Sequence, residues 1–90
     1  KMDAAHSIEH HIYSYSINDF RSVSEAGRKL GYIVQHEGQH EDAKGKFWSQ
    51  DLVMVSIPSI KNIENQSIEI DSISEKHHSD YDGWGTEIVQ

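Results

Sequence analysis

The sequence contains no cysteine among its 90 residues and only one proline, Pro58. The missing cysteine excludes disulfide bridges, thiolate nucleophiles, cysteine-ligated zinc and iron–sulfur clusters, and it fits a reducing compartment such as the cytosol. Basic residues are also few: 8 Lys and Arg oppose 15 Asp and Glu, giving a formal net charge of −7. This charge disfavours non-specific binding to nucleic acid and to anionic membranes, because both need clustered positive charge.

Long apolar runs are missing as well. The longest one is Leu52-Val53-Met54-Val55, far short of the roughly 18 residues of a membrane span, and no signal-peptide pattern opens the chain. Hydrophobic residues make up 36% of the sequence and aromatic residues 9%, which is enough to predict a folded chain. At this length we expect one domain, residues 1–90, with one modest core.

In the first part of the chain, residues on the two faces of a predicted strand alternate, and the spacing of apolar residues then changes to that of a helix. Ser7–Tyr15 alternates in the manner of a strand, with Ile8, His10 and Ile12 on one face and Glu9, His11, Tyr13 and Tyr15 on the other. Apolar residues then recur at helical spacing over Ile17–Leu30. Ser16 is placed to cap the start of this helix and Gly31 to end it.

The middle of the chain is predicted to contain two strands and a long loop. Tyr32–His36 reads as a strand, and the polar segment Glu37–Lys46 is predicted to be a loop, the connection of a long hairpin. The apolar run Leu52–Ile57 is typical of a central strand that is buried on both sides. Pro58 ends it, because proline cannot donate to the ladder of a sheet.

The last third is predicted to be a helix followed by a strand. The isoleucines between Ile60 and His78 fit the spacing of a helix and also that of a strand. The segment is long for a strand, which favours a helix from about Ile63 to His78, with Asn62 as its candidate N-cap. Asp80–Val89 is predicted to be the last strand, and its two glycines permit a bulge. The order β-α-β-β-α-β predicts an α+β, ferredoxin-like sandwich, with a four-stranded antiparallel sheet and two helices on one face.

Seven histidines are the compositional oddity: His6, His10, His11, His36, His40, His77 and His78. A zinc site needs three or four convergent ligands, whereas the adjacent residues His10 and His11 point to opposite faces of a strand. We therefore expect no metal and no cofactor, and interpret the imidazoles as surface groups, with His10 half-buried at the edge of the core. No nucleophile turn and no phosphate-binding glycine loop occurs in the sequence, so we expect no enzyme.

Two aromatic groups are candidate binding sites. Tyr13 and Tyr15 share a predicted strand face with His11, and Tyr81 and Trp84 lie in the segment YDGWGT. Trp84 fits burial in the core and exposure as an interface anchor equally well. The first group could also stack RNA bases, although no basic residue adjoins that strand in the sequence.

Two segments of the sequence resemble one known family. Ser7–Ile12 with the helix end Leu30-Gly31-Tyr32, and the closing segment Asp80–Thr86, resemble the regulator of ribonuclease activity B family, the protein inhibitors of ribonuclease E. The resemblance implies a cytoplasmic bacterial regulator that binds ribonuclease E, reduces its RNA cleavage and alters degradosome composition, with no catalytic residue. Family members carry an upstream helical segment and an acidic tail, so the single domain is compatible with the loss of natural terminal segments.

The resulting hypothesis is a non-enzymatic regulator that binds ribonuclease E as a protein partner, without contacting nucleic acid or membrane directly. The residues predicted to contact the partner are His11, Tyr13, Tyr15, Glu41, Asp42, Tyr81, Asp82 and Trp84. An RNA- or ligand-binding module that uses the open sheet face is the alternative, and an immunity or adaptor protein on the same fold is a third. The oligomeric state stays open.

Overall fold

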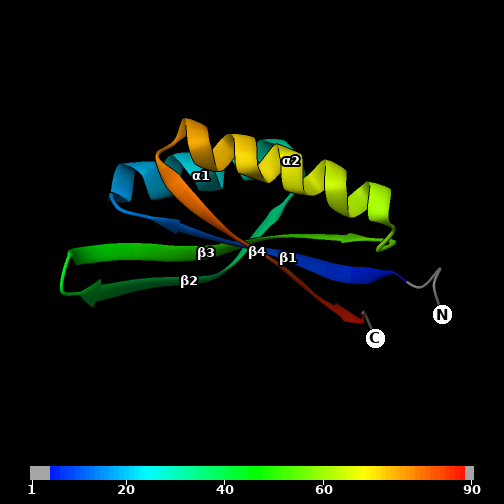
Figure 1. The fold of residues 1–90 in the computed structure, drawn as a ribbon, viewed down its shortest axis with the longest axis horizontal. Helices are drawn as coiled ribbons and strands as arrows, with labels where there is room; N and C mark the ends of the chain where they lie inside the picture. Colours follow the sequence, from blue (N-terminus) through cyan, green and yellow to red (C-terminus); the bar gives the residue numbers. More distant parts are fainter. Residues whose placement is uncertain (1–4, 89–90) are drawn as a thin grey trace.

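The computed structural model describes residues 5–88, which form two helices and one four-stranded sheet. In chain order the elements are β1 (His6–Ser14), α1 (Ile17–Lys29), β2 (Ile33–Asp42), β3 (Gly45–Ser56), α2 (Ile60–Lys76) and β4 (Ser79–Ile88). All neighbouring strands are antiparallel and their order is β2-β3-β1-β4. Both helices lie on one side of the sheet, and the other side is uncovered (Figure 1). The predicted ferredoxin-like α+β sandwich is confirmed.

Helix α1 begins and ends as the sequence predicts. The hydroxyl of Ser16 accepts a hydrogen bond from the backbone N–H of Asp19 at 3.1 Å, which satisfies one of the free donors of the first turn. Gly31 follows the helix with φ of +95°, a conformation that glycine adopts without strain. The N–H of Tyr32 then donates back to the carbonyl of Gly27 at 3.0 Å and closes the helix end.

The predicted loop Glu37–Lys46 is wrong. β2 continues to Asp42, and only Ala43 and Lys44 form the turn before β3. The hairpin pairs Gly38 with Ser49 and Asp42 with Gly45. Such an edge strand is polar because little of it is covered, and its lack of apolar alternation hid it from the sequence analysis.

The second helix is confirmed, but its start was misplaced. α2 begins at Ile60 rather than near Ile63, and Ser59 is its N-cap, accepting from the N–H of Asn62 at 3.1 Å. The side-chain amide of Asn62 donates instead to the carbonyl of Ile57 at 2.8 Å. A serine directly after Pro58 can cap the helix without a further loop residue, so the connection is shorter than predicted.

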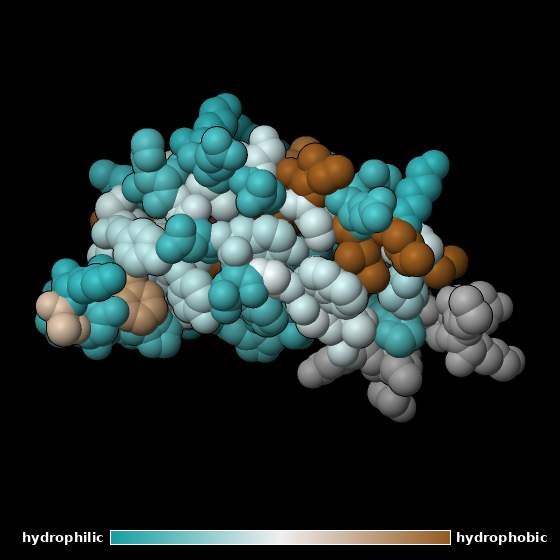
Figure 2. Space-filling view, viewed as in Figure 1, coloured by the Kyte–Doolittle hydropathy of each residue, from teal (hydrophilic) through white to brown (hydrophobic). Residues whose placement is uncertain are grey.

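The core lies between the helices and the covered face of the sheet. Its buried members are Ile12, Val23, Tyr32, Leu52, Ile70 and Ile73. α1 approaches the sheet closely at Gly27, where a Cβ atom would lie 2.7 Å from Leu52 Cδ1. At the end of β3 and the start of α2, apolar side chains reach the surface instead (Figure 2), and Ile60 is 78% exposed.

The last strand contains the bulge that its glycines predict. The register of β4 against β1 shifts between His10, which pairs with Trp84, and Ile12, which pairs with Tyr81. Gly83 lies in the extra segment with φ of +99°. The shift keeps both Tyr81 and Trp84 opposite residues of β1 whose side chains face the helices.

Candidate functional site

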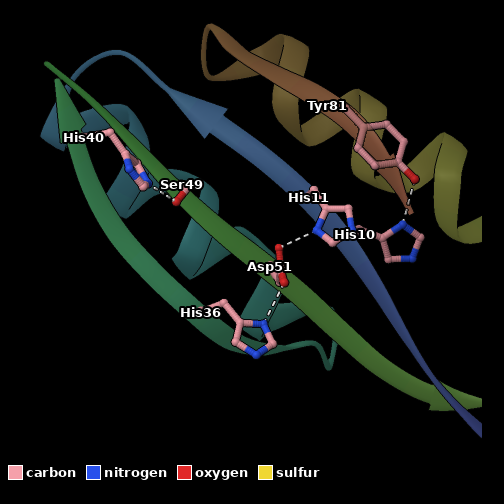
Figure 3. A network of polar contacts seen from close by, with 7 residues as sticks. All are labelled: His10, His11, His36, His40, Ser49, Asp51 and Tyr81. Atoms are coloured by element: carbon pink, nitrogen blue, oxygen red, sulfur yellow. Dashed lines mark hydrogen bonds and ion pairs between the residues drawn. The ribbon is translucent and has the colours of Figure 1, made fainter. Parts of the chain in front are cut away.

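The adjacent residues His10 and His11 lie on opposite faces of β1, as their alternation predicts. His10 is fully buried under the helices, so the expectation of a half-buried position is wrong. Its Nδ1 lies 2.8 Å from the Tyr81 hydroxyl and its Nε2 lies 2.9 Å from Oε1 of Gln66. Figure 3 shows the contact of the His10 ring with Tyr81 as a dashed line.

The two partners of His10 define its protonation. Because Oε1 of Gln66 can only accept, Nε2 of His10 donates, and Nδ1 then accepts from the hydroxyl of Tyr81. Burial lowers the pKa of His10 below its usual 6.5, outweighing the hydrogen bond to Gln66, which acts in the opposite direction. Burial also raises the pKa of Tyr81. The pair is therefore neutral and structural near pH 7.

On the open face, Asp51 of β3 lies between two imidazoles. Its Oδ1 is 2.7 Å from Nδ1 of His11 on β1, and its Oδ2 is 2.7 Å from Nδ1 of His36 on β2 (Figure 3). The Asp51 side chain is only 13% exposed, whereas those of His11 and His36 are 37% and 62% exposed. Three neighbouring strands thus place one carboxylate and two accessible rings at the centre of the face.

His36 reaches this position through a break in the β2 ladder. The register against β3 shifts between Gln35 and Gly38, and His36 has a φ of +54°, which is uncommon for a residue with a Cβ atom. This conformation lets the imidazole meet Asp51 from the edge of the sheet. Spacing along the sequence gives no sign of such a bulge, so His36 was missed.

A second feature of the open face is an aromatic hollow near the β2–β3 turn. It is lined by Tyr13, Tyr15, Asp42 and Phe47, and has a volume of about 280 Å³. The rings of Tyr13 and Phe47 meet edge to face with centroids 6.1 Å apart. We call these four residues the aromatic hollow. It combines exposed ring surface with one carboxylate, a composition typical of a protein-binding patch.

Two polar contacts hold the rim of the aromatic hollow. The ring of His40 stacks on Phe47 with centroids 4.9 Å apart, and its Nε2 lies 2.8 Å from the hydroxyl of Ser49. The hydroxyl of Tyr15 donates to the carboxylate of Asp80. That hydrogen bond raises the pKa of Tyr15 to about 12, so its hydroxyl stays protonated at neutral pH.

The structure brings together only some of the predicted contact residues. Tyr13, Tyr15 and Asp42 meet in the aromatic hollow, and His11 lies on the same face beside Asp51. The others are placed elsewhere. Tyr81 is hydrogen-bonded to buried His10, Trp84 is 45% exposed on the edge strand β4, and Asp82 is exposed beside it. Glu41 lies opposite Lys46 in the strand register of the β2–β3 hairpin.

Four residues of the face escaped the sequence analysis: His36, His40, Phe47 and Asp51. A signal for Phe47 and Asp51 is the alternation Phe47-x-Ser49-x-Asp51 on β3, which puts these side chains on the face opposite Leu52. The sequence analysis does not use this alternation, because it predicts a loop up to Lys46. One ligand atom each of Glu9, His36 and Asp51 also lies within 4.8 Å of the others, a spacing at which a metal ion could be held.

Comparisons with known proteins point in one direction. A family model described as regulator of ribonuclease activity B matches residues 1–86. Proteins named regulator of ribonuclease activity B from Photobacterium profundum, Idiomarina loihiensis and Haemophilus influenzae are 32%, 31% and 32% identical to this chain. The matches cover 93%, 92% and 93% of the chain but 65%, 66% and 56% of the relatives, so the chain spans less than two thirds of their length.

In the part of the chain that the structure describes, no helix combines the length and the apolar character that crossing a bilayer requires.

Proposed function

The chain belongs to the regulator of ribonuclease activity B family, and on this premise we propose that it is a non-enzymatic protein that binds ribonuclease E and inhibits its RNA cleavage. The family match over residues 1–86 is the observation that carries the proposal. The relatives are named for regulating a ribonuclease. With ribonuclease E as its partner, the chain would act in the cytoplasm, in RNA decay and at the degradosome. The proposal extends to this chain what the relatives' names say of longer proteins.

We assign the contact to the open sheet face, centred on the aromatic hollow. Tyrosine and other large rings dominate the energy of protein interfaces, because they bury much area at a low cost in side-chain entropy. Tyr15 is 55% exposed and Tyr13 is in contact with Phe47, so a partner can cover all three rings together. The helices cannot compete for this face, since both lie on the opposite side of the sheet (Figure 1).

The charge of the chain supports the same partner class. A ribonuclease is basic where it holds phosphate, and a chain of net charge −7 is attracted to such a surface. Asp42 lies in the hollow and Asp80 beside it, hydrogen-bonded to Tyr15. A partner that brings arginine or lysine to this rim would therefore meet carboxylates next to aromatic rings, which favours binding and its rate.

The test measures binding and cleavage with purified ribonuclease E. The unmodified chain should bind at micromolar concentration or tighter and slow RNA cleavage. Tyr13→Ala and Phe47→Ala should each weaken binding about tenfold or more, as for interface anchors. Ile60→Ala is the matched control, because it removes an exposed apolar side chain that lies outside the hollow, and it should leave binding unchanged.

Three outcomes would count against the proposal. If the chain did not bind ribonuclease E, the proposed partner would be wrong. If it bound without slowing cleavage, the proposed inhibition would be wrong. If Trp84→Ala rather than Tyr13→Ala abolished binding, the contact would lie on β4 and the assigned surface would be wrong.

RNA binding on the same face is the second candidate, and one observation favours it. Lys44 and Lys46 line a smaller hollow together with Tyr15 and Phe47, so positive charge and rings do meet at the hairpin. Affinity for a single-stranded RNA would then fall steeply with salt, because phosphate contacts release counterions. RNA binding that is steeply salt-dependent, without binding of the nuclease, would favour this function over inhibition.

A further inference from the structure

Three side chains from neighbouring strands converge on the open face, away from the aromatic hollow. Glu9 comes from β1, Asp51 from β3 and His36 from β2, and one ligand atom of each lies within 4.8 Å of the others. Two oxygen donors and one imidazole nitrogen thus lie near one another. We propose that these three residues bind a divalent transition-metal ion of the zinc type.

An ion of this size requires the three donor atoms to move closer together. Bonds of about 2.0–2.2 Å to nitrogen and oxygen, at tetrahedral angles, put the donor atoms of one ion about 3.3–3.6 Å apart. Glu9 has a long side chain and His36 is largely exposed, so rotation about side-chain bonds can bring their donor atoms toward Asp51.

The donor set decides the class of ion. An imidazole with two carboxylates suits zinc and its first-row neighbours, because imidazole favours these metals. Magnesium and calcium prefer shells made of oxygen alone. The net charge of −7 also favours a cation at this face. We therefore expect Zn²⁺ or Co²⁺ to bind, and Mg²⁺ to compete only at large excess.

Neighbouring groups orient two of the three residues, as they do for metal ligands in proteins. His11 lies 2.7 Å from the Asp51 oxygen that does not face His36, and so orients the carboxylate. Such a hydrogen bond from outside the ligand set is a regular feature of metal sites. The β2 bulge holds the His36 backbone at φ of +54°, with its imidazole against Asp51.

Three protein ligands leave at least one coordination position open. In zinc sites of this kind a water molecule or an outside donor takes the fourth position. Because no helix within residues 5–88 covers this face of the sheet (Figure 1), the open position is accessible to a carboxylate or imidazole of another molecule. The ion would then bridge the chain to whatever lies on the sheet.

The experiment titrates the full chain with Zn²⁺ by calorimetry and with Co²⁺ by visible absorption. One ion per chain is expected, and Glu9→Gln, His36→Gln and Asp51→Asn should each weaken binding at least tenfold. His40→Gln is the matched control: it removes a histidine of the same face that lies outside the three ligands and bonds to Ser49, and it should leave the affinity within twofold. Circular dichroism checks that each variant is folded.

A measurement on the unmodified chain keeps the test independent of folding. Adding Zn²⁺ should shift the NMR signals of the His36 ring and of the amides near Glu9 and Asp51, while a tenfold excess of Mg²⁺ should not reverse the shifts. Equal affinity in His36→Gln, or shifts spread over most of the seven histidines, would mean adventitious binding only and would overturn the proposal.

Discussion

The two faces of the sheet use the same kind of residue in opposite ways. On the covered face, His10 is fully buried, and both of its ring nitrogens have protein partners. On the open face, its neighbour His11 is 37% exposed and shares the carboxylate of Asp51 with His36. Each ring is satisfied, but only those of the open face can meet another molecule. The covered face therefore carries stability, and the open face is the one that we propose for recognition.

The largest expected effect is the difference in stability between truncating an apolar side chain on the covered face and truncating one on the open face. Leu52→Ala on the covered face should lower the free energy of unfolding by about 3 kcal/mol, because it leaves a cavity in a fully buried site. Ile33→Ala, at a position 57% exposed on the open face, should change it by less than about 0.5 kcal/mol. Urea denaturation measures both. Equal losses would contradict the division between the faces.

The next effect compares the two adjacent histidines. His10→Ala should cost about 2 kcal/mol of unfolding free energy, since it leaves the Tyr81 hydroxyl and Gln66 without a buried partner. His11→Ala should cost less than about 1 kcal/mol, because water can replace its hydrogen bond to Asp51. Thermal denaturation of the two variants checks the difference, and a larger loss for His11→Ala would reverse the assignment.

Acidification should lower the free energy of unfolding through His10 of the covered face. The pKa of His10 is lowered in the folded state. The unfolded chain therefore binds a proton at a higher pH than the folded chain does. Stability is full above the unfolded pKa of 6.5 and falls as the pH drops toward the folded pKa, by at most about 1.4 kcal/mol per pH unit for one proton.

The measurement is the free energy of unfolding between pH 7.5 and 5, with a chelator present to exclude metal effects. His10→Gln should show a shallower fall than the natural chain, because glutamine does not titrate. A parallel fall in both chains would show that other groups govern the acid sensitivity.

The smallest effect lies at the rim of the aromatic hollow. His40→Ala removes a stacked ring and a hydrogen bond to Ser49 at an exposed site, so it should cost only about 0.5 kcal/mol of unfolding free energy. Chemical denaturation can resolve this value against Leu52→Ala. A cost near that of a core residue would mean that the open face also carries stability.

Local patterns predicted the elements where each residue type acts on its own backbone. The cap at Ser16, the helix end at Gly31 and the bulge beside Gly83 follow from hydrogen bonding and allowed φ angles within a few residues. The second part of β2, residues 37–42, could not be predicted in this way. These residues are polar apart from Gly38, and they are held extended by their pairing with β3, which local preference does not include.

The candidate site divides in the same manner. Tyr13 and Tyr15 were recognised because strand alternation places them on one face with His11. Phe47, Asp51 and His36 were not, because their meeting depends on the register of three strands and on a bulge. Register is set by the hydrophobic match across the whole sheet rather than by any one segment.

By itself, the sequence determined the order of the elements, the acidic charge, the absence of thiol chemistry and the family to which the chain belongs. These properties depend on residue identity and on neighbours a few positions away. Only the tertiary structure decided that His10 is buried while His36 and Asp51 meet on the open face. Contacts between strands far apart in the chain follow from burying one common core, and side-chain chemistry on the opposite face is a consequence of that burial.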